Sequence, residues 1–474
     1  MTIRTKIVAT IGPASNSLEM LTKLVKAGMN VARLNFSHGN YEAHTEAIRN
    51  IRSISRTLNR PVGILLDLQG PKIRVGKLEN GEPVRLKRNA PMAITVKPMQ
   101  GNAERVSTTY TNLPGDVQPG DTILLDDGLI RLRVESKTSD TVHCKVRNGG
   151  LLKENKGINL PGVNVSAPSL TDKDVRDVGF GIQNGVDFFA LSFVRTEQDL
   201  TVIKSIMKKQ GVSIPVIAKI EKPEAVENLD SILASADGIM VARGDLGVEM
   251  QPELVPIIQK KIIAAAVRRN KPVITATQML ESMTVNPIPT RAEASDVANA
   301  IFDRTDAVML SAETASGKYP VKAVQMMRKI AKEAEESPFI KFNLRYDTDP
   351  NDPVAHAVAQ NAVNILQEAG ARCIISFSVS GSTSKQISRQ RPSKPVYAFT
   401  SQKETYQRLS LLWGITPMFI GMIENAARLV EASERLLMGK NWLQKGDLVV
   451  LVIGMGLKSG STNMIKLHRV GYDD

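Results

Sequence analysis

The chain has 474 residues, of which 42% are hydrophobic and 23% are charged, a composition that excludes wholesale disorder and predicts about two to four folded domains. Its two cysteines, Cys144 and Cys373, exclude a disulfide framework beyond one bridge and indicate a reducing, cytoplasmic compartment. The longest late apolar run, LVVLVIGMG, is well short of the roughly 20 residues that span a bilayer.

The balance of charge is basic, with 61 lysines and arginines against 48 acidic residues and a net charge of +13. A basic surface attracts nucleic acid and small phosphates alike. Only 4% of the residues are aromatic, and they do not interleave with the basic ones. We therefore expect neither a nucleic-acid nor a membrane partner.

Apolar, strand-like runs alternate with amphipathic, helix-like stretches in two blocks. The first block predicts strands at 6–11, 30–36 and 62–68, with helices at 18–27 and 41–58. The second predicts strands at 187–194, 215–220, 238–242, 272–276 and 306–310, with helices that include 224–234 and 254–269. Eight such units predict a (β/α)8 TIM barrel built from residues 1–70 and 169–341.

Two further domains are expected. Residues 71–168 have short β-patterned pieces between Gly, Pro, Asn and Asp turns, and they predict a small all-β lid, a β-barrel inserted after the third barrel strand. That insertion point places the lid over the C-terminal face of the barrel. Residues 342–474 predict a doubly wound α/β domain with strands at 373–377, 396–399, 417–420 and 448–453.

Polar residues end three consecutive barrel strands, in the runs PVIAKIE, DGIMVARGD and PVITATQ. Side chains two residues apart in a strand share a face, so the pairs expected to project together are Lys219 with Glu221, Arg243 with Asp245, and Thr275 with Thr277. A lysine, two acids and a hydroxyl on one rim predict a metal-assisted site for an anionic substrate.

The second strand, VARLNFSHG, places Arg33, Asn35 and Ser37 on one face. Arg33 suits a phosphate or a carboxylate, and the oxygens of Asn35, Ser37 and Asp67 suit a hard cation. The alternative is that Asn35 and Ser37 cap the following helix.

Glu221 and Asp245 are the predicted ligands of Mg²⁺ or Mn²⁺. The alternative is that each acid only charges a helix N-terminus. Thr277 can relay a proton or be merely a β-prone residue, and Ser311 and Glu313 carry the same ambiguity.

Two Ser/Thr/Gly-rich loops of the C-terminal block, SVSGSTSK and GMGLKSGST, follow strands directly. Either they are ordinary turns or they form a phosphate effector site. The candidate effector residues are Ser378, Ser380, Gly381, Ser382, Thr383, Lys458, Gly460 and Ser461.

These stretches resemble the pyruvate kinase family. The resemblance rests on TKIVATIGPAS, NVARLNFSHG, ILLDLQGPKIR, DDGLI, NKGINLPG, ATQMLESM, MLSAETASGKYP and the run from AKIEKPEA to MVARGDLGVE. It implies transfer of the phosphoryl group of phosphoenolpyruvate to ADP, which gives pyruvate and ATP. It also implies a homotetramer and activation by a sugar phosphate or nucleotide.

The resemblance implies roles for individual residues. Arg33 would bind the substrate phosphate and Lys219 would stabilise the phosphoryl group in flight. Glu221 and Asp245 would hold Mg²⁺, Gly244 would line the substrate position, and Thr277 would lie where the enolate is protonated. The residues that would meet the nucleotide are Asn35, His38, Arg74 and Lys173.

One departure concerns monovalent cations. Members of the family that need K⁺ read LDTKGPEIR where this chain reads LDLQGPKIR, so Leu68 and Lys72 replace a threonine and a glutamate. An ammonium group near Asn35, Ser37 and Asp67 would repel K⁺, and we therefore expect catalysis that does not require it.

Two rival functions remain from the sequence. A Mg²⁺-dependent barrel lyase acting on 2-oxo acids can use the same pair of acids, and ADP dependence would separate it from a kinase. A basic RNA-binding protein with a retired active site is the non-enzymatic alternative, and steep salt dependence of binding would identify it.

Overall fold

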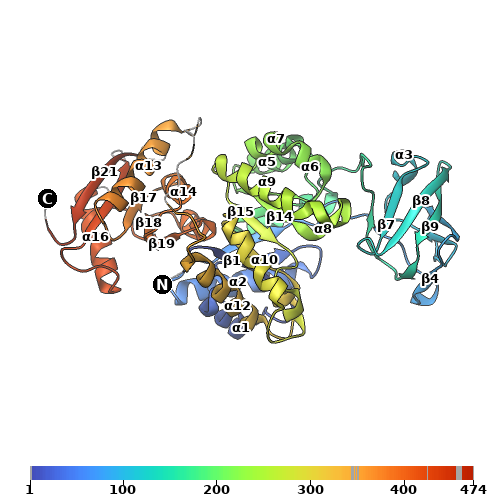
Figure 1. Ribbon diagram of the computed structural model, residues 1–474, viewed down its shortest axis with the longest axis horizontal. Coiled ribbons are helices and arrows are strands. Elements are labelled where there is room, and N and C mark those ends of the chain that lie inside the picture. The colour runs from blue at the N-terminus through green and yellow to red at the C-terminus, as the bar shows by residue number, and fades with distance from the viewer. Residues whose placement is uncertain are drawn as a thin grey trace.

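A computed structural model describes residues 3–342, 346, 349, 352–423, 425–454 and 462–472. The molecule is elongated, with the barrel in the middle, the inserted β-domain at one end and the C-terminal domain at the other (Figure 1). None of the helices in these ranges is long and apolar enough to cross a membrane.

Eight parallel strands close the central barrel in the order β1-β16-β15-β14-β13-β12-β3-β2. This confirms the predicted (β/α)8 barrel. The strands are β1 (Lys6–Ile11), β2 (Val31–Asn35), β3 (Gly63–Asp67), β12 (Phe188–Leu191), β13 (Val216–Ile220), β14 (Gly238–Ala242), β15 (Val273–Ala276) and β16 (Ala307–Leu310).

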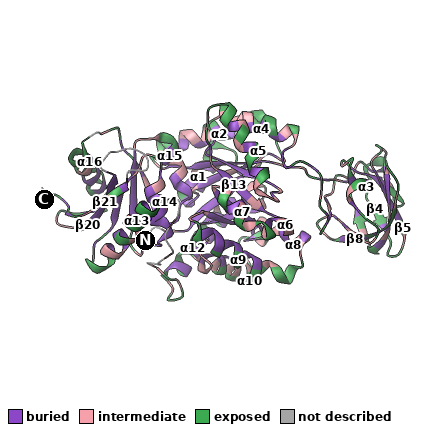
Figure 2. Cartoon of the chain, turned by 90° about the horizontal axis from the view of Figure 1, so that it is seen from above, coloured by how far each residue is buried: buried purple, intermediate pink, exposed green. Residues whose placement is uncertain are grey.

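Alternate residues of the strands face inward and outward, and both faces are buried (Figure 2). Val8, Leu65 and Met240 belong to the cluster that fills the barrel interior, whereas Ile7 and Leu66 pack in the larger cluster under the surrounding helices. Leu411 of the C-terminal domain joins the interior cluster. The C-terminal domain therefore closes the N-terminal face of the barrel and leaves the opposite face for chemistry.

Helices surround the barrel. They are α1 (Leu18–Ala27), α2 (Tyr41–Thr57), α4 (Asp172–Gln183), α5 (Glu197–Lys209), α6 (Pro223–Glu227), α7 (Leu229–Ser235), α8 (Arg243–Glu249), α9 (Val255–Arg268), α10 (Arg291–Phe302), α11 (Ala312–Ala315) and α12 (Pro320–Glu336). Thr171 with Asp174 and Thr290 with Glu293 form capping boxes that fix where α4 and α10 begin. The predicted helix 224–234 is two helices, because the chain breaks at Asn228.

The inserted domain is β-structured apart from the short α3 (Leu113–Asp116) and a 3-10 turn, η1 (Glu79–Gly81). Its strands are β4 (Val84–Leu86), β5 (Pro91–Thr95), β6 (Arg105–Ser107), β7 (Thr122–Leu125), β8 (Ile130–Lys137), β9 (Thr141–Asn148), β10 (Gly150–Leu152) and β11 (Ile158–Asn159). They form a six-stranded sheet, β11-β7-β8-β9-β5-β6, and a separate pair, β10-β4. Isolated bridges from Arg74 to Gly157 and from Val75 to Thr108 link its two edges, in place of the continuous closure expected for a β-barrel.

The C-terminal domain has a five-stranded sheet in the order β19-β18-β17-β20-β21. Its strands are β17 (Ile374–Phe377), β18 (Val396–Thr400), β19 (Ile415–Phe419), β20 (Leu448–Gly454) and β21 (Thr462–Arg469), and its helices are α13 (Pro353–Glu368), α14 (Ser382–Arg389), α15 (Lys403–Arg408) and α16 (Ala426–Gly439). Hydrophobic clusters cover both faces of the sheet, as predicted for a doubly wound domain. The antiparallel strand β21 was not predicted.

Candidate active site

The C-terminal ends of β2, β3 and β13 bring three charged side chains together. Arg33 donates from Nε to Oδ2 of Asp67 at 2.7 Å and from an Nη nitrogen to the hydroxyl of Thr10 at 2.9 Å. The other carboxylate oxygen of Asp67 lies 3.3 Å from Nζ of Lys219. Asp67 is only 1% exposed, so its charge is balanced by these two cations and not by water.

Lys219 is the centre of the cluster. Its Nζ lies 2.8 Å from Oε1 of Glu221 and donates to the hydroxyl of Ser192 at 2.8 Å. The second oxygen of Glu221 accepts from the backbone N–H of Phe193 at 2.8 Å. The prediction that Lys219 and Glu221 project together is therefore confirmed.

Neighbouring charges decide how these groups hold their protons. Burial alone would lower the pKa of Lys219, but Asp67, Glu221 and Asp245 outweigh it and raise that pKa above its ordinary value. Burial acts to raise the pKa of Asp67, yet Lys219 and Arg33 hold it below the usual range. Lys219 is consequently a fixed positive charge and Asp67 a fixed negative one.

Glu221 behaves differently, because burial raises its pKa, Lys219 opposes that shift and the carboxylate of Asp245 adds to it. Two carboxylates that repel each other across a buried space fit a cation, which would relieve the repulsion. The described residues hold no group of three His, Cys, Asp or Glu side chains placed to bind a metal. The donor set is thus a carboxylate pair of the kind that Mg²⁺ uses when water and substrate complete its shell.

Arg243 and Asp245 do not project together, contrary to the expectation from strand alternation. The strand ends at Ala242, and α8 begins at Arg243. Arg243 turns toward the next strand, where it donates to the carbonyl of Thr277 at 2.7 Å and pairs with Asp296 at 2.6 Å. Asp245 lies in the first turn of the helix, as the alternative reading proposed, and it still faces the lysine cluster.

Thr275 and Thr277 are also separated. Thr275 is buried and donates to the hydroxyl of Thr305 at 2.9 Å, away from the site. Thr277 lies beyond the end of β15 with a φ of 68°, so the chain has turned before it. Its hydroxyl accepts from the N–H of Gly244 at 2.7 Å and donates to the carbonyl of Ala276 at 2.6 Å, which brings Gly244 and Thr277 together at the rim.

The chain after β2 forms a turn and does not extend the strand. Asn35 accepts from the N–H of Ser37 at 3.1 Å, and Asn40 is the residue that caps α2. The capping alternative for Asn35 and Ser37 is therefore wrong. Lys173 donates to the carbonyl of Phe36 at 2.7 Å, which fixes this turn against α4.

Lys72 does not occupy the position that the sequence suggested. The cations that contact Asp67 are Arg33 and Lys219, whereas Lys72 is exposed and has no ion pair with any described residue. Its charge acts on His38: burial lowers the pKa of His38, and Lys72, Arg74 and Arg33 lower it further. Leu68, the other departure, is 1% exposed.

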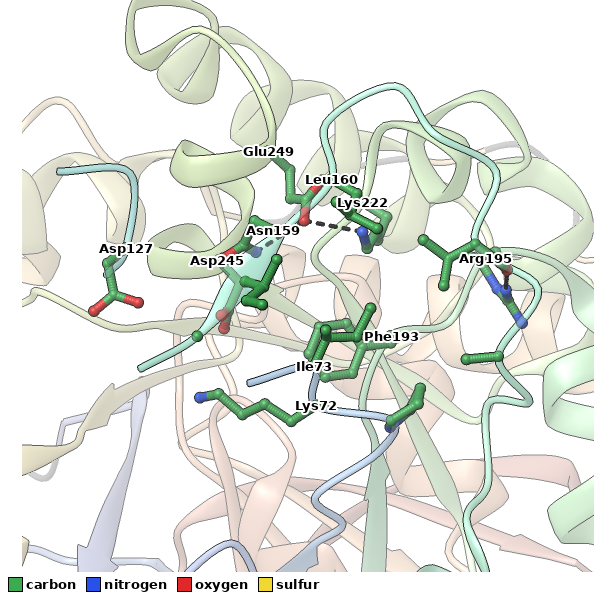
Figure 3. Close-up of a pocket in the computed structure, with 15 residues that line it drawn as sticks. Lys72, Ile73, Asp127, Asn159, Leu160, Phe193, Arg195, Lys222, Asp245 and Glu249 are labelled. Atoms are coloured by element: carbon green, nitrogen blue, oxygen red, sulfur yellow. Dashed lines mark hydrogen bonds and ion pairs between the residues drawn. The ribbon is translucent and has the colours of Figure 1, made fainter. Parts of the chain in front are cut away.

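A pocket of about 620 Å³ lies between the lid and the barrel and includes Lys72 and Asp245 (Figure 3). Lys222 pairs with Glu249 at 2.9 Å, and Asn159 of the lid donates to the same carboxylate oxygen at 2.9 Å. This bond joins the lid to α8, directly beside Asp245.

Sequence reasoning missed Ser192, Lys222 and Asn159. The rule applied to the other strands would have found Ser192, because it is the first polar residue after β12. Glu313, by contrast, is fully buried and accepts from the N–H groups of Leu280 and Ser311, which is a structural role.

The first Ser/Gly loop of the C-terminal domain leads into α14. Ser378 accepts from the N–H of Gly381 at 2.9 Å, and Ser380 donates to the hydroxyl of Ser382 at 3.2 Å. Thr383 is buried and bonds to Thr462. Three other candidate effector residues, Lys458, Gly460 and Ser461, lie outside the described residues.

Comparison with known proteins gives consistent matches. Residues 2–324 match the pyruvate kinase barrel domain, and residues 356–468 match the pyruvate kinase alpha/beta domain. The chain is 46% identical to a pyruvate kinase of Staphylococcus saprophyticus, over 99% of this chain and 80% of that one. It is 45% identical to the pyruvate kinase of Mycobacterium intracellulare, over the full length of both. A crystal structure of a pyruvate kinase from Cryptosporidium parvum superposes with a TM-score of 0.91 at 38% identity, covering 99% of this chain and 96% of the other.

Proposed function

Since the chain belongs to the pyruvate kinase family and is a phosphotransferase, we propose a division of labour among its own residues in the transfer from phosphoenolpyruvate to ADP. One observation carries the proposal: a buried lysine, Lys219, stands at the carboxyl ends of the barrel strands with Asp67 and Glu221 as its partners. Barrel enzymes place their chemistry at that face.

Lys219 stabilises the phosphoryl group as it leaves the substrate. Phosphoryl transfer depends on positioning and on charge stabilisation more than on covalent chemistry, so a fixed ammonium in a site sheltered from water suits it. Asp67 and Glu221 both contact that ammonium group directly and hold it in place. Arg33, aligned by Asp67 and Thr10, binds the phosphate of the substrate.

Glu221 and Asp245 are the residues that hold Mg²⁺ or Mn²⁺, and Gly244 lines the substrate position. The ion, when bound, would neutralise charge on the carboxylate and phosphate of the substrate. Thr277 lies beside Gly244, and its hydroxyl is placed to pass a proton through water to the enolate carbon.

The nucleotide lies on the other side of the rim. Asn35, Ser37 and His38 form the turn after β2, Lys173 is hydrogen-bonded to that turn, and Arg74 lies where the lid begins. The positive charges of Lys72 and Arg74 around His38 favour the phosphates of ADP there.

Catalysis does not require K⁺. The support is that Asp67 already has two cationic partners, and that Lys72 adds a further positive charge near Arg33 and His38, where a cation would otherwise be needed. Lys72 supplies this positive charge by its electrostatic field at the nucleotide side of the site, and not by a contact with Asp67.

The remaining proposals come from the family. They are domain boundaries at residues 71, 169 and 342, a homotetramer, a cytoplasmic location, and activation by a sugar phosphate or nucleotide at the two Ser/Gly loops. The support for the first loop is the row of hydroxyls at Ser378, Ser380 and Ser382 before α14.

The test is pyruvate formation from phosphoenolpyruvate with Mg²⁺, with and without ADP. Turnover that requires ADP and yields equal amounts of ATP and pyruvate supports the kinase. Pyruvate without ADP would indicate the lyase. No turnover by folded protein, with sugar phosphates and nucleoside monophosphates also supplied, would contradict both.

A further inference from the structure

A second charged pocket, remote from the active site, lies between the barrel and the C-terminal domain. It encloses about 250 Å³ and opens to solvent. The barrel contributes Lys271 before β15 and Asp306 before β16, and the C-terminal domain contributes Lys385, Arg389 and Arg391. The helix α14, which carries Lys385 and Arg389, lies on the side of its domain that faces the barrel (Figure 1).

The charges that line this pocket do not balance. Asp306 is the one carboxylate among its lining residues, against four cationic side chains. Both oxygens of Asp306 are already engaged, one by Arg391 at 2.9 Å and the other by the N–H of Val273 at 2.8 Å. Asp306 therefore pairs with Arg391 and has no oxygen left for Lys385.

Lys271 and Arg389 have partners elsewhere in the protein, whereas Lys385 has none among the described residues. Lys271 donates to the carbonyl of Ala236 at 2.6 Å, and Arg389 donates to the carbonyls of Val267 and Arg268. Nε of Arg391, a side chain only 3% exposed, has no hydrogen-bond partner within the described part of the chain. Lys385 has neither an ion pair nor a side-chain hydrogen bond to any described residue.

Two acids near Lys385 outside the pocket, Asp237 and Asp349, have partners of their own. Asp237 is bonded to the N–H of Val216 and paired with Lys204, and Asp349 accepts from Gln386. The pKa of Lys385 is lowered to about 8, by burial first and by Lys271 second, although Asp237, Asp306 and Asp349 oppose the shift. A partly buried cation without a counter-charge is costly, and a bound anion would relieve that cost.

We propose that this pocket binds a small tetrahedral oxyanion of the phosphate class between the two domains. Convergent ammonium and guanidinium donors form short, charge-assisted bonds to such an ion, and one ion can accept from both domains at once. It would thereby join α14 to the chain that enters β15, the strand that leads to Thr277 in the active site. The pocket is lined by Lys385, Ser388 and Arg389 of α14 and by no residue of the Ser378–Thr383 loop, so it is distinct from that loop.

The test uses inorganic phosphate and the full-length chain. The melting temperature is measured at pH 7 while phosphate replaces chloride at constant ionic strength, for the wild type and for Lys385→Met. Phosphate should raise the melting temperature of the wild type by about 2 °C at ten times its dissociation constant. Lys385→Met should lose most of that rise, because it removes the donor without a protein partner.

Lys394→Met is the matched control, since Lys394 is exposed, lies five residues after the end of α14 and removes the same charge. Lys394→Met should keep the full rise. A rise caused by phosphate at the active site would remain in Lys385→Met. If Lys385→Met responds to phosphate like the wild type, the proposal is wrong. Should Lys385→Met not fold, Lys271→Met tests the barrel side in the same way, and an unchanged response would again reject the site.

Discussion

Two partly buried lysines at opposite ends of the barrel show how a counter-charge changes the effect of burial. Lys219 has carboxylates on two sides, and its pKa is raised although it is buried. Lys385 has no carboxylate in contact, and burial, with a smaller contribution from Lys271, lowers its pKa to about 8. The first arrangement keeps a fixed positive charge at the carboxyl ends of the barrel strands, and the second leaves a lysine without a carboxylate in contact. Desolvation is common to both, so the counter-charge decides the outcome.

The largest effect should come from replacing Lys219, the lysine that has carboxylate partners. Lys219→Met should lower kcat by at least about a thousand-fold, because the ammonium acts on charge that develops in the transition state. Initial rates of pyruvate formation at saturating substrates measure this. Lys6→Met is the control, since Lys6 is also a buried lysine but donates to the carbonyl of Ile415 at the opposite face of the barrel. Equal losses in the two variants would mean that Lys219 serves stability alone.

Removing the counter-charge should destabilise the protein. Asp67→Asn leaves Arg33 and Lys219 buried beside a neutral amide, which should cost about 3–5 kcal/mol in the free energy of unfolding. Urea unfolding followed by circular dichroism measures it. The double variant Asp67→Asn with Lys219→Met should recover part of the loss. Additive losses would show that the two groups do not interact.

A smaller effect is expected at the nucleotide side. The wild type should turn over equally in K⁺ and in a tetraalkylammonium salt, whereas Lys72→Glu should become about tenfold slower without K⁺, since it removes the positive charge near His38. Lys77→Glu makes the same charge change at an exposed position and should stay independent of K⁺. A wild type that needs K⁺ would contradict the role given to Lys72.

The smallest effect is the pH dependence of stability that Lys385 causes. The pKa of Lys385 is about 8 in the folded chain and 10.5 ordinarily, so between these values the unfolded chain binds more protons and stability rises with pH. The penalty from Lys385 is therefore complete below about pH 8 and vanishes near pH 10.5. In phosphate-free buffer, Lys385→Met should melt above the wild type at pH 7, and the difference should shrink toward pH 10. A difference that is constant with pH would show that the lysine does not titrate as described.

The sequence by itself determined the eight strands and the polar residues at their ends, because buried parallel strands are continuous apolar runs that stop where polar chemistry begins. It also determined the doubly wound C-terminal domain and the pairing of Lys219 with Glu221. These features depend on local pattern and on an alternation that carries over from Lys219 to Glu221, the first residue after the strand.

Only the tertiary structure decided where side chains beyond the strand ends point. Arg243 starts a helix and Thr277 follows a turn, so alternation no longer applies to either. The strand β21 went unpredicted because its exposed and half-buried residues give no apolar run. The partners of Asp67, the bond from Asn159 to Glu249 and the cationic pocket at Lys385 join residues far apart in sequence. No local pattern encodes them, since each arises from the closure of the barrel and from the packing of two domains against it.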